Sequence, residues 1–435
     1  MINKVSVIGL GKLGSPIIAT LGERGFKTLG ADINEHYVTC INNAEAPVEE
    51  PLLDEMLKKN KDLIKASLDV EDVVYQTDAT LIIVPTPSEA NGEFSTAFVI
   101  EALKPIAKAL ARKSDFHVIV LTSTVLPGAS EKDIIPVLEN LSGKKCGVDF
   151  GYCYNPEFIA LGSVIKNLLN PDFILIGESD KKSGDLLEEF YKRYCENNPP
   201  IQRMRIVNAE ITKISINTFV TTKISFANMI AQLCDMIPGG NVDEVTSAVG
   251  LDKRIGLKYL KGGVGYGGPC FPRDNRALAK VYDKFGLEHS IAKATDKINQ
   301  SHADFIVDKI TKLIPEGKSV AVLGLSYKPN TPVIEESQNI QVAKKLIEKG
   351  YSVTAYDPLS NDNAKNILSD INYTQSVNEC IKDKDLICLM TTWEEFSNLD
   401  PNIFKNNQIV VDCWRILDPE KFQNHMQLIH LGINK

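Results

Sequence analysis

A glycine-rich turn near the N-terminus limits the possible folds of this chain more than any other feature. The motif Gly9-Leu10-Gly11-Lys12-Leu13-Gly14 follows an apolar run at residues 5–8 and opens a helical pattern at residues 13–24. A second strand pattern at residues 28–31 then ends in Asp32. A strand, a glycine turn, a helix and a second strand in this order predict a parallel sheet with crossover helices.

The three glycines of this motif suit the binding of a dinucleotide. The first would make a tight turn, the second would let the backbone approach a pyrophosphate, and the third would let the helix pack closely on the strand. Asp32 would accept hydrogen bonds from the adenosine ribose and repel a 2′-phosphate. The sequence therefore predicts NAD, rather than NADP, as the cofactor. An ordinary turn of an α/β protein is the alternative interpretation of the glycines alone.

A helical region and a weaker copy of the first pattern follow along the chain. Residues 208–236 contain no Gly or Pro and predict one long helix. Residues 319–357 repeat the strand, turn and second strand, but only Gly324 of the three glycines remains. From its residues, this copy either binds a nucleotide diphosphate beside Lys328 or is purely structural.

The expected fold class is α/β, with two Rossmann-like, doubly wound parallel sheets joined by a helical middle. We place the NAD-binding domain at residues 1–200. A helical domain follows at residues 201–314. The second Rossmann-like domain occupies residues 315–435. The boundaries fall at turn-rich segments near residues 200 and 315.

Composition argues against several classes of protein. The net charge of -8 is unfavourable for broad binding to nucleic acid or to anionic membranes, although it permits a local basic pocket. No apolar run has the length of a signal-peptide core or of a membrane span. The nine cysteines have no CxxC spacing and indicate reduced thiols, and therefore a cytoplasmic protein. The six histidines show no metal-binding spacing, so we expect no metal.

Cys270 lies in an unusual segment, Gly262-Gly-Val-Gly-Tyr-Gly-Gly-Pro-Cys270-Phe-Pro-Arg-Asp274. So many glycines are unfavourable for a regular helix or strand, and they could bring the backbone close to a ligand and present the thiol in a pocket. A cysteine considered alone is more often a small buried hydrophobic residue than a nucleophile. The residues by themselves leave both interpretations open.

Nearly the whole chain resembles the UDP-glucose/GDP-mannose dehydrogenase family. Besides the glycine motif and the cysteine loop, several short segments occur in the order of that family. They are Thr86-Pro87, Ser123-Thr124-Val125, Asn155-Pro156-Glu157-Phe158, Glu210-Ile211-Thr212-Lys213 with Asn217, Arg254-Ile255-Gly256, Tyr327-Lys328-Pro329-Asn330-Thr331 and Thr392-Trp393-Glu394-Glu395-Phe396.

The resemblance implies an enzyme that oxidises the C6 alcohol of a nucleotide sugar to a carboxylate with two NAD. Its cysteine would capture the intermediate aldehyde as a thiohemiacetal, which becomes a thioester that water hydrolyses. The lysine and the asparagine of the long helix would stabilise the oxyanion at C6, an aspartate would organise the lysine or a water, and a glutamate and a threonine would act on the hydrolytic water. The catalytic residues implied are Cys270, Lys213, Asn217, Asp274, Glu157 and Thr124.

The resemblance also implies the binding residues and an oligomer. The cofactor contacts are Gly9, Gly11, Leu13, Gly14, Asp32, Thr86 and Thr124. The substrate contacts are Glu157, Lys213, Asn217, Arg254, Tyr259, Lys261, Gly265, Tyr327 and Lys328, with the third domain binding UDP. Arg254 would reach the sugar site of a neighbouring subunit, which implies a homodimer or a larger homo-oligomer. The long helix would be its shared spine, although a core helix of a single chain fits the periodicity equally well.

Three positions depart from the family pattern. Leu161 replaces a second glutamate after Glu157, so hydrolysis would depend on Glu157 alone. Glu335 stands where an arginine is expected near the cofactor, and Trp414 stands where an arginine could contact the sugar. These changes bear on the mode of cofactor contact and on which sugar is bound.

We expect UDP-glucose as the substrate, because the cysteine loop resembles the glucose and mannose branch of the family. GDP-mannose, a UDP-N-acetylhexosamine or another nucleotide sugar are the alternatives among enzymes. A homologue that binds NAD and a nucleotide sugar without completing hydrolysis is the alternative of another class, and Leu161 is the residue that suggests it.

Overall fold

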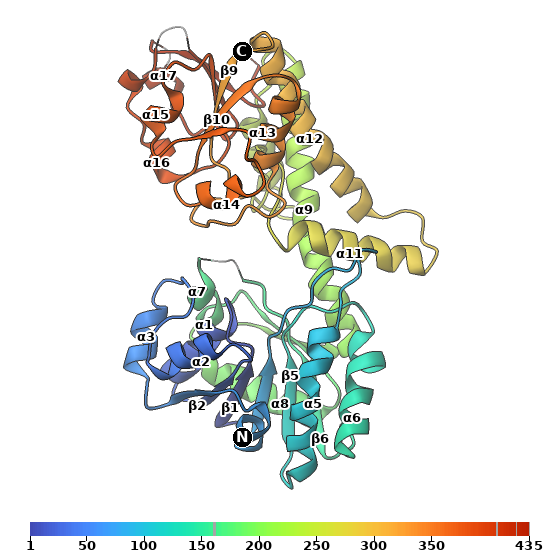
Figure 1. Ribbon diagram of the computed structural model, residues 1–435. Coiled ribbons are helices and arrows are strands. Elements are labelled where there is room, and N and C mark those ends of the chain that lie inside the picture. The colour runs from blue at the N-terminus through green and yellow to red at the C-terminus, as the bar shows by residue number, and fades with distance from the viewer. Residues whose placement is uncertain (160–161, 406–407, 423, 435) are drawn as a thin grey trace. The chain divides into compact units, whose positions relative to one another are not determined.

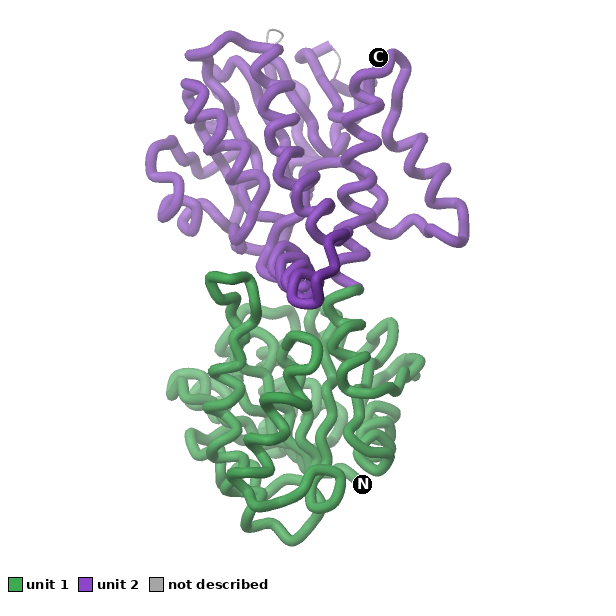
Figure 2. The backbone as a smooth tube through the Cα atoms, turned by 90° about the vertical axis from the view of Figure 1, so that its right-hand side faces the viewer, with its two compact units in different colours: residues 1–215 green, residues 216–435 purple. Residues whose placement is uncertain are grey.

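The computed structural model describes residues 1–159, 162–405, 408–422 and 424–434. The chain divides into two compact units, Met1–Ser215 and Ile216–Lys435 (Figure 2). The division falls inside helix α9 (Ile206–Met236), which is the long helix predicted for residues 208–236. The finer division into three domains stays a prediction.

An eight-stranded sheet forms the framework of the first unit (Figure 1). Its order is β3-β2-β1-β4-β5-β6-β7-β8, and all neighbours are parallel except β6 and β7. An antiparallel extension at the edge of a parallel sheet is common in such folds. The strands are β1 (Lys4–Ile8), β2 (Lys27–Ala31), β3 (Ile64–Ser67), β4 (Ala79–Ile82), β5 (His117–Leu121), β6 (Phe150–Tyr154), β7 (Ile174–Glu178) and β8 (Ile201–Arg205).

Helices cover both faces of this sheet. One face packs on α1 (Gly14–Glu23), α2 (Glu35–Asn42), α3 (Leu53–Lys59), α7 (Val164–Leu169) and α8 (Lys181–Tyr194). The other packs on α4 (Val70–Tyr75), α5 (Ala97–Arg112) and α6 (Ile135–Ser142). In β5, Val118 and Val120 face the first core, while Ile119 and Leu121 face the second. Successive side chains point to opposite faces of a strand, so a strand covered on both sides is a continuous apolar run.

The second unit contains the helical region and a six-stranded, wholly parallel sheet. The order of this sheet, β11-β10-β9-β12-β13-β14, repeats that of the first six strands of the first unit, and it is the order of dinucleotide-binding sheets. The predicted fold class is therefore confirmed. The strands are β9 (Ser319–Leu323), β10 (Ser352–Tyr356), β11 (Asn372–Tyr373), β12 (Leu386–Leu389), β13 (Ile409–Asp412) and β14 (Gln427–His430).

The helices of the second unit fall into two groups. Besides the C-terminal part of α9, the helical region contains α10 (Val242–Leu251), α11 (Phe271–Lys284) and α12 (Ile291–Leu313). Helix α12 packs on α11 and also, with α13 (Gln338–Glu348), on one face of the second sheet. The other face is covered by α15 (Val377–Ile381), α16 (Glu394–Ser397) and α17 (Pro419–Phe422), while the short α14 (Asn361–Lys365) lies near α13 and its core.

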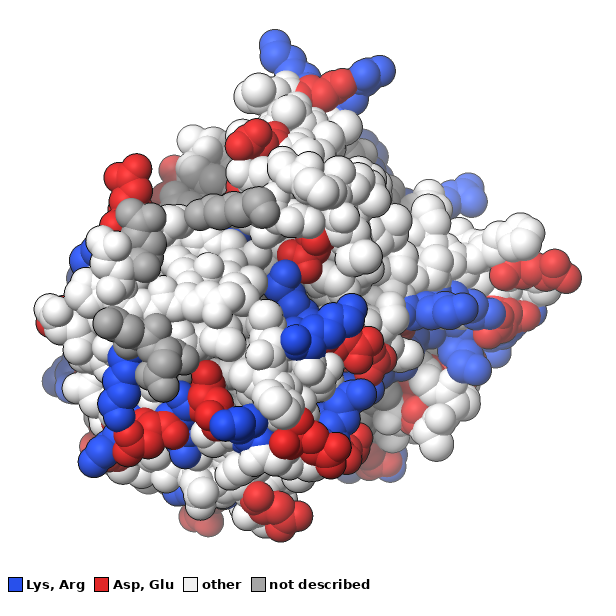
Figure 3. Space-filling view, turned by 90° about the horizontal axis from the view of Figure 1, so that it is seen from above, with Lys and Arg blue, Asp and Glu red and all other residues white. Residues whose placement is uncertain are grey.

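The surface charges and the lengths of the helices can be compared with the protein classes that the composition argues against. On the face seen in Figure 3, Lys and Arg side chains are interspersed with Asp and Glu. No helix within the described ranges has both the length and the apolar character that a crossing of a bilayer requires.

Candidate active site

The glycine turn between β1 and α1 has the geometry that a dinucleotide requires. Gly9 has a φ of 98°, and a Cβ atom there would collide with the carbonyl oxygen of Ile83. A Cβ atom on Gly14 would likewise collide with the carbonyl oxygen of Gly9. At Gly11, by contrast, a Cβ atom would meet nothing within 4 Å. The fold needs glycine at the first and third positions, whereas the second faces open space that a pyrophosphate could occupy.

Asp32 follows β2 and is fixed against the glycine turn. Its Oδ2 accepts a hydrogen bond from Leu10 N at 2.6 Å, and its Oδ1 accepts one from Asn34 N at 2.8 Å. The side chain is only half-buried. The carboxylate is therefore held in place while its exposed part stays accessible to the hydroxyl groups of a ribose, so the residues of this turn fit NAD.

The corresponding carboxylate of the second sheet has a different role. Asp357, which follows β10, is 1% exposed. It accepts hydrogen bonds from the backbone N–H groups of Leu325 and Ser326 at 2.8 and 3.0 Å, and from those of Leu359 and Ser360 at 3.0 and 2.9 Å. Backbone groups of the protein occupy both of its oxygens. The Asp357 carboxylate is consequently not available to bind a ribose as Asp32 is.

Two threonines lie at the carboxyl ends of the central strands, beside the glycine turn. Thr86 follows β4, and its hydroxyl donates to the carbonyl oxygen of Thr124, after β5, at 2.7 Å. Leu13, the remaining predicted cofactor contact, precedes α1 and packs partly against the first core. The carboxyl ends of parallel strands at this point of a doubly wound sheet are the usual place for a ligand. The predicted cofactor residues of the first unit therefore share one edge of its sheet.

Glu157 and Lys213 are neighbours in the first unit. The Lys213 ammonium donates to the carbonyl oxygen of Glu157 at 2.7 Å and lies 4.7 Å from the centre of the Phe158 ring. Burial raises the pKa of the Glu157 carboxyl to about 7, and the charge of Lys213 acts in the opposite direction. A carboxylate with a pKa near neutrality can act as a general base. Leu161, whose effect on hydrolysis was in question, lies outside the described residues.

Glu210 is a buried carboxylate whose role the sequence did not reveal. It lies on α9, three residues before Lys213, and accepts hydrogen bonds from Gly128 N at 2.5 Å and Ser130 N at 3.0 Å. Burial raises its pKa. Glu210 thus ties the segment that follows Thr124 to the helix that carries Lys213.

Cys270 precedes α11 in the second unit. Its side chain is exposed, whereas the other eight cysteines are buried or half-buried. Burial raises the pKa of the Cys195 and Cys380 thiols to about 12, which makes them inert. The N-terminus of a helix favours a negative charge and therefore suits a thiolate. Exposure and helix position both distinguish Cys270 as the candidate nucleophile.

Asp274 and Asn217 join α11 to α9 within the second unit. The Asn217 amide donates to Asp274 Oδ2 at 2.6 Å, and Asp274 is 1% exposed. Arg273 Nε also donates to this carboxylate, at 3.3 Å. The contact places the predicted oxyanion residue Asn217 beside the first turn of α11, one turn after Cys270.

The glycine loop before Cys270 is packed against the segment that follows β9. A Cβ atom on Gly268, whose φ is 82°, would lie 2.6 Å from the Tyr327 ring, and one on Gly265 would collide with Asn299. Lys328 is half-buried next to Tyr327, with its ammonium 5.7 Å from that ring centre. The predicted substrate residue Tyr327 therefore lies against the glycine loop with Lys328 next to it, whereas Gly265 packs against Asn299 of α12.

The remaining predicted substrate residues are on the surface. Tyr259 and Lys261 are exposed just before the glycine loop. The Arg254 side chain is 88% exposed, and its guanidinium pairs with Asp252 at 2.6 Å.

Two of the departures from the family pattern are structural within this unit. Trp414 donates from its indole N–H to the carbonyl oxygen of Met390 at 2.9 Å, and its ring lies directly against Gly263. Glu335 is exposed, and its carbonyl oxygen accepts from Gly268 N at 2.9 Å. Both residues support the glycine loop.

Arg415 is a loop-holding residue that the sequence did not single out. Its side chain is 2% exposed and pairs with Asp243 at 2.7 Å. It also donates to the carbonyl oxygen of Gly262 at 2.5 Å. The sequence shows only that Arg415 follows Trp414, a position that departs from the family pattern. It does not indicate the partners of Arg415.

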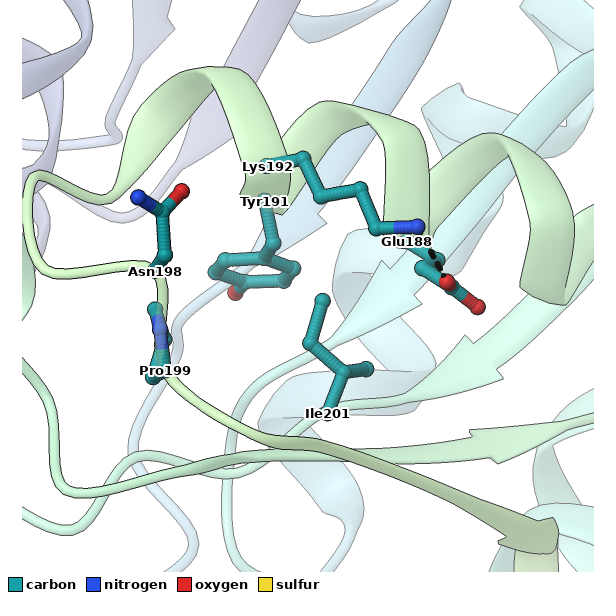
Figure 4. Close-up of a pocket in the computed structure, with 6 residues that line it drawn as sticks. All are labelled: Glu188, Tyr191, Lys192, Asn198, Pro199 and Ile201. Atoms are coloured by element: carbon teal, nitrogen blue, oxygen red, sulfur yellow. Dashed lines mark hydrogen bonds and ion pairs between the residues drawn. The ribbon is translucent and has the colours of Figure 1, made fainter.

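A surface cavity of about 390 Å³ lies elsewhere on the first unit. It is lined by the end of α8, the following loop and the start of β8 (Figure 4). Lys192 and Glu188 pair with each other on its wall, and the Tyr191 ring points into it (Figure 4). None of the predicted site residues lines this cavity. Among the described residues, no group of His, Cys, Asp or Glu is arranged to hold a metal ion.

Three family models match successive parts of the chain. They describe the NAD binding domain at residues 3–195, the central domain at 207–301 and the UDP binding domain at 321–419 of one family. The chain belongs to the UDP-glucose/GDP-mannose dehydrogenase family. It is therefore an NAD-dependent nucleotide-sugar dehydrogenase, and the resemblance inferred from the sequence is confirmed.

Similar members of the family carry more than one name. The UDP-glucose 6-dehydrogenase AglM of Haloferax volcanii is 33% identical over 431 residues, which are 98% of this chain and 100% of that protein. The GDP-mannose 6-dehydrogenase of Pseudomonas syringae pv. syringae is 34% identical over 411 residues, 91% of this chain and 92% of that protein. The structure of a UDP-glucose dehydrogenase from Pyrobaculum islandicum has a TM-score of 0.90 at 30% identity, and covers 100% of this chain and 98% of that one.

Proposed function

We propose that this dehydrogenase oxidises UDP-glucose to UDP-glucuronate through a covalent bond to Cys270. The single observation that carries the proposal is the exposure of Cys270 on a glycine-rich loop at the start of α11, while the other eight cysteines are buried or half-buried. UDP-glucose is preferred because a relative named UDP-glucose 6-dehydrogenase aligns with 98% of this chain. In addition, the structure of a UDP-glucose dehydrogenase matches its fold with a TM-score of 0.90.

The proposed chemistry begins with the loss of a hydride and a proton from the C6 alcohol. NAD, when bound, accepts a hydride in each of the two oxidations. The thiolate of Cys270 adds to the resulting aldehyde, and the oxyanion of the thiohemiacetal is stabilised by the Asn217 amide and the Lys213 ammonium. Asp274 keeps Asn217 oriented through the hydrogen bond between them.

The second oxidation converts the thiohemiacetal into a thioester. Glu157 then takes a proton from a water molecule, which attacks the thioester carbonyl and releases the carboxylate and the Cys270 thiolate. Thr124 helps to position that water. A pKa of about 7 makes Glu157 a suitable base near neutral pH, because a substantial fraction of it is ionised there.

We propose that the binding residues keep the roles that the family resemblance implies. The open side of Gly11 and the fixed carboxylate of Asp32 support contacts to the pyrophosphate and the ribose of NAD. The proposed NAD contacts are Gly9, Gly11, Leu13, Gly14, Asp32, Thr86 and Thr124. The proposed contacts to the nucleotide sugar are Glu157, Lys213, Asn217, Arg254, Tyr259, Lys261, Gly265, Tyr327 and Lys328.

NADH formation per sugar consumed tests this proposal. Purified protein and NAD would be given UDP-glucose, UDP-galactose, GDP-mannose, UDP-GlcNAc or UDP-ManNAc, with NADH followed at 340 nm. We expect about two NADH per UDP-glucose, because the double oxidation reduces two cofactors. About one NADH would mean that the reaction stops at the aldehyde. No NADH with any sugar would favour a homologue that only binds its ligands.

GDP-mannose is the second candidate substrate. A relative named GDP-mannose 6-dehydrogenase is as similar in sequence as the one named for UDP-glucose, at 34% against 33% identity. In the same panel, a higher kcat/KM with GDP-mannose than with UDP-glucose would decide for it.

We also propose that the enzyme is a homodimer joined along α9. Apolar side chains are exposed on this helix at Phe219, Phe226, Met229, Leu233 and Met236. Their spacings of seven, three, four and three residues form the stripe along which two helices pair. Arg254, also exposed, would then reach the partner's sugar site.

Sedimentation velocity tests the dimer. We expect Phe226→Glu with Leu233→Glu to raise the dissociation constant of the dimer by at least about 100-fold, since each buried apolar side chain contributes about 2 kcal/mol. Phe285→Glu, which alters a more exposed apolar side chain just after α11, is the control and should leave the dimer intact. A monomeric wild type at micromolar concentration would contradict the proposal.

A further inference from the structure

A buried polar network lies beneath the first turn of α11. Its centre is Tyr266, a residue of the glycine loop that is 4% exposed. The Tyr266 hydroxyl donates to Asp296 on α12 and accepts from the amide of Asn275 on α11, the latter at 2.9 Å. The loop and two helices therefore meet at one hydroxyl group.

The backbone of Tyr266 is held as firmly as its side chain. Asn299, also on α12, accepts from Tyr266 N at 2.8 Å and donates to Tyr266 O at 2.9 Å. One asparagine thus satisfies both backbone groups of the tyrosine. The loop position is fixed independently of the hydroxyl, so removal of the hydroxyl alone should leave the loop in place.

The network continues from α11 to α9. The fully buried Asn275 and Thr221 exchange hydrogen bonds, with the Asn275 amide donating at 3.0 Å and the Thr221 hydroxyl donating at 3.2 Å. This contact lies next to the one between Asn217 and Asp274, since the partners are four residues apart on α9 and adjacent on α11. Two neighbouring contacts thus set how α11 lies along α9.

We propose that Tyr266 is a positioning residue for the thiol of Cys270. Its hydroxyl bonds both Asp296 and Asn275, which also contact each other directly at 3.2 Å, and Asn275 continues the network to Thr221. Together these bonds fix the direction of the first turn of α11. Cys270 is the residue that precedes this turn, and Asp274 lies within it. Because a displacement of about 1 Å can lower a rate about 100-fold, the network matters to the capture of the aldehyde.

The inference rests on the proposed thioester mechanism, and it predicts a specific failure. A misdirected thiol still permits the first oxidation, which does not need the covalent bond. It captures the aldehyde poorly, so part of the aldehyde leaves before the second oxidation. The signature of Tyr266→Phe is therefore fewer than two NADH per sugar, together with a carbonyl product that semicarbazide traps.

The experiment compares Tyr266→Phe with Tyr351→Phe. Tyr351 is also buried, and its hydroxyl donates to Ile314 O at 3.0 Å, away from the cysteine loop. The readouts are kcat and KM, NADH per sugar, semicarbazide adduct and the rate of Cys270 alkylation by iodoacetamide. We expect Tyr266→Phe to lower kcat at least about ten-fold, to change the alkylation rate and to yield aldehyde, with the KM for NAD unchanged. The control should behave as the wild type.

The outcomes separate this inference from the proposed function. If the wild type and Tyr351→Phe give about two NADH per sugar while Tyr266→Phe does so with an unchanged kcat, the positioning role is wrong. If the wild type itself gives no more than one, the proposed function fails, and the alkylation rate alone tests the network. Should Tyr266→Phe not fold, the nearly isosteric Thr221→Val breaks the same network at α9. Unchanged alkylation and stoichiometry in that variant would overturn the inference.

Discussion

Replacing Cys270 by alanine is expected to lower the formation of the sugar carboxylate by at least about 1,000-fold, while the first oxidation still yields about one NADH per sugar. Without the thiol, the aldehyde has no covalent acceptor, and the thioester cannot form. NADH per sugar consumed, together with the yield of the sugar carboxylate, measures the loss. Cys146→Ala is the control, because this half-buried thiol lies in the first unit and outside the proposed site. Full turnover in the alanine variant would remove Cys270 from the mechanism.

Cys270→Ser refines the same test. The serine oxygen leaves an ester less readily than sulfur leaves a thioester, so an acyl-enzyme should accumulate. Intact-protein mass spectrometry after a single turnover would detect the adduct. Its absence, with slow NADH formation, would mean that the serine never captured the aldehyde.

Glu157→Gln is expected to lower steady-state turnover by about 100- to 10,000-fold through the loss of the general base. The oxidations do not need this carboxylate, so a rapid burst of NADH should precede the slow phase as the thioester accumulates. Stopped-flow absorbance separates the two phases. Glu139→Gln, at a half-buried carboxylate paired with Lys145 and outside the proposed site, is the matched control.

The pH profile gives a second test of Glu157. Burial raises its pKa from 4.5 to about 7, and only the ionised form can accept a proton from water. Turnover should therefore rise with pH through about 7, and Glu157→Gln should lose this limb. The same shift links pH to stability, because the folded protein holds the proton more tightly than the unfolded chain. The contribution of Glu157 to stability is present below pH 4.5 and is lost as the pH rises through about 7. If turnover of Glu157→Gln still rose with pH as it does in the wild type, another group would be responsible for that rise.

Much of the fold could be predicted from apolar patterning. Strand β5 reads His-Val-Ile-Val-Leu, and this run predicts a strand at residues 117–121, as observed, because a strand buried on both faces is an almost continuous apolar run. Strand β8 was missed, because Ile-Gln-Arg-Met-Arg shows no such run. It lies at the edge of the sheet, where the Arg203 side chain forms an ion pair of 2.6 Å with Glu178 of the neighbouring strand β7. Its stability derives from partners that a local pattern does not contain.

The candidate site shows the same limit. The glycine turn and Asp32 were predictable because a short segment contains the whole geometry. The hydrogen bond from Arg415 to Gly262 O and the network around Tyr266 join residues that are far apart in the sequence. Buried hydrogen bonds of this kind depend on tertiary contacts, and they leave no periodic signal in the chain.

The turns held by Asp32 and Asp357 are similar in sequence pattern, but substitutions in them are expected to have different effects. At Asp32, two backbone donors leave part of the carboxylate facing solvent, so a changed side chain there alters which cofactor is preferred before it alters the integrity of the domain. At Asp357, the chain itself consumes every oxygen lone pair that a ligand would need. A substitution at Asp32 can therefore change the cofactor preference while the fold is retained. A substitution at Asp357 would instead destabilise the turn that this carboxylate holds together.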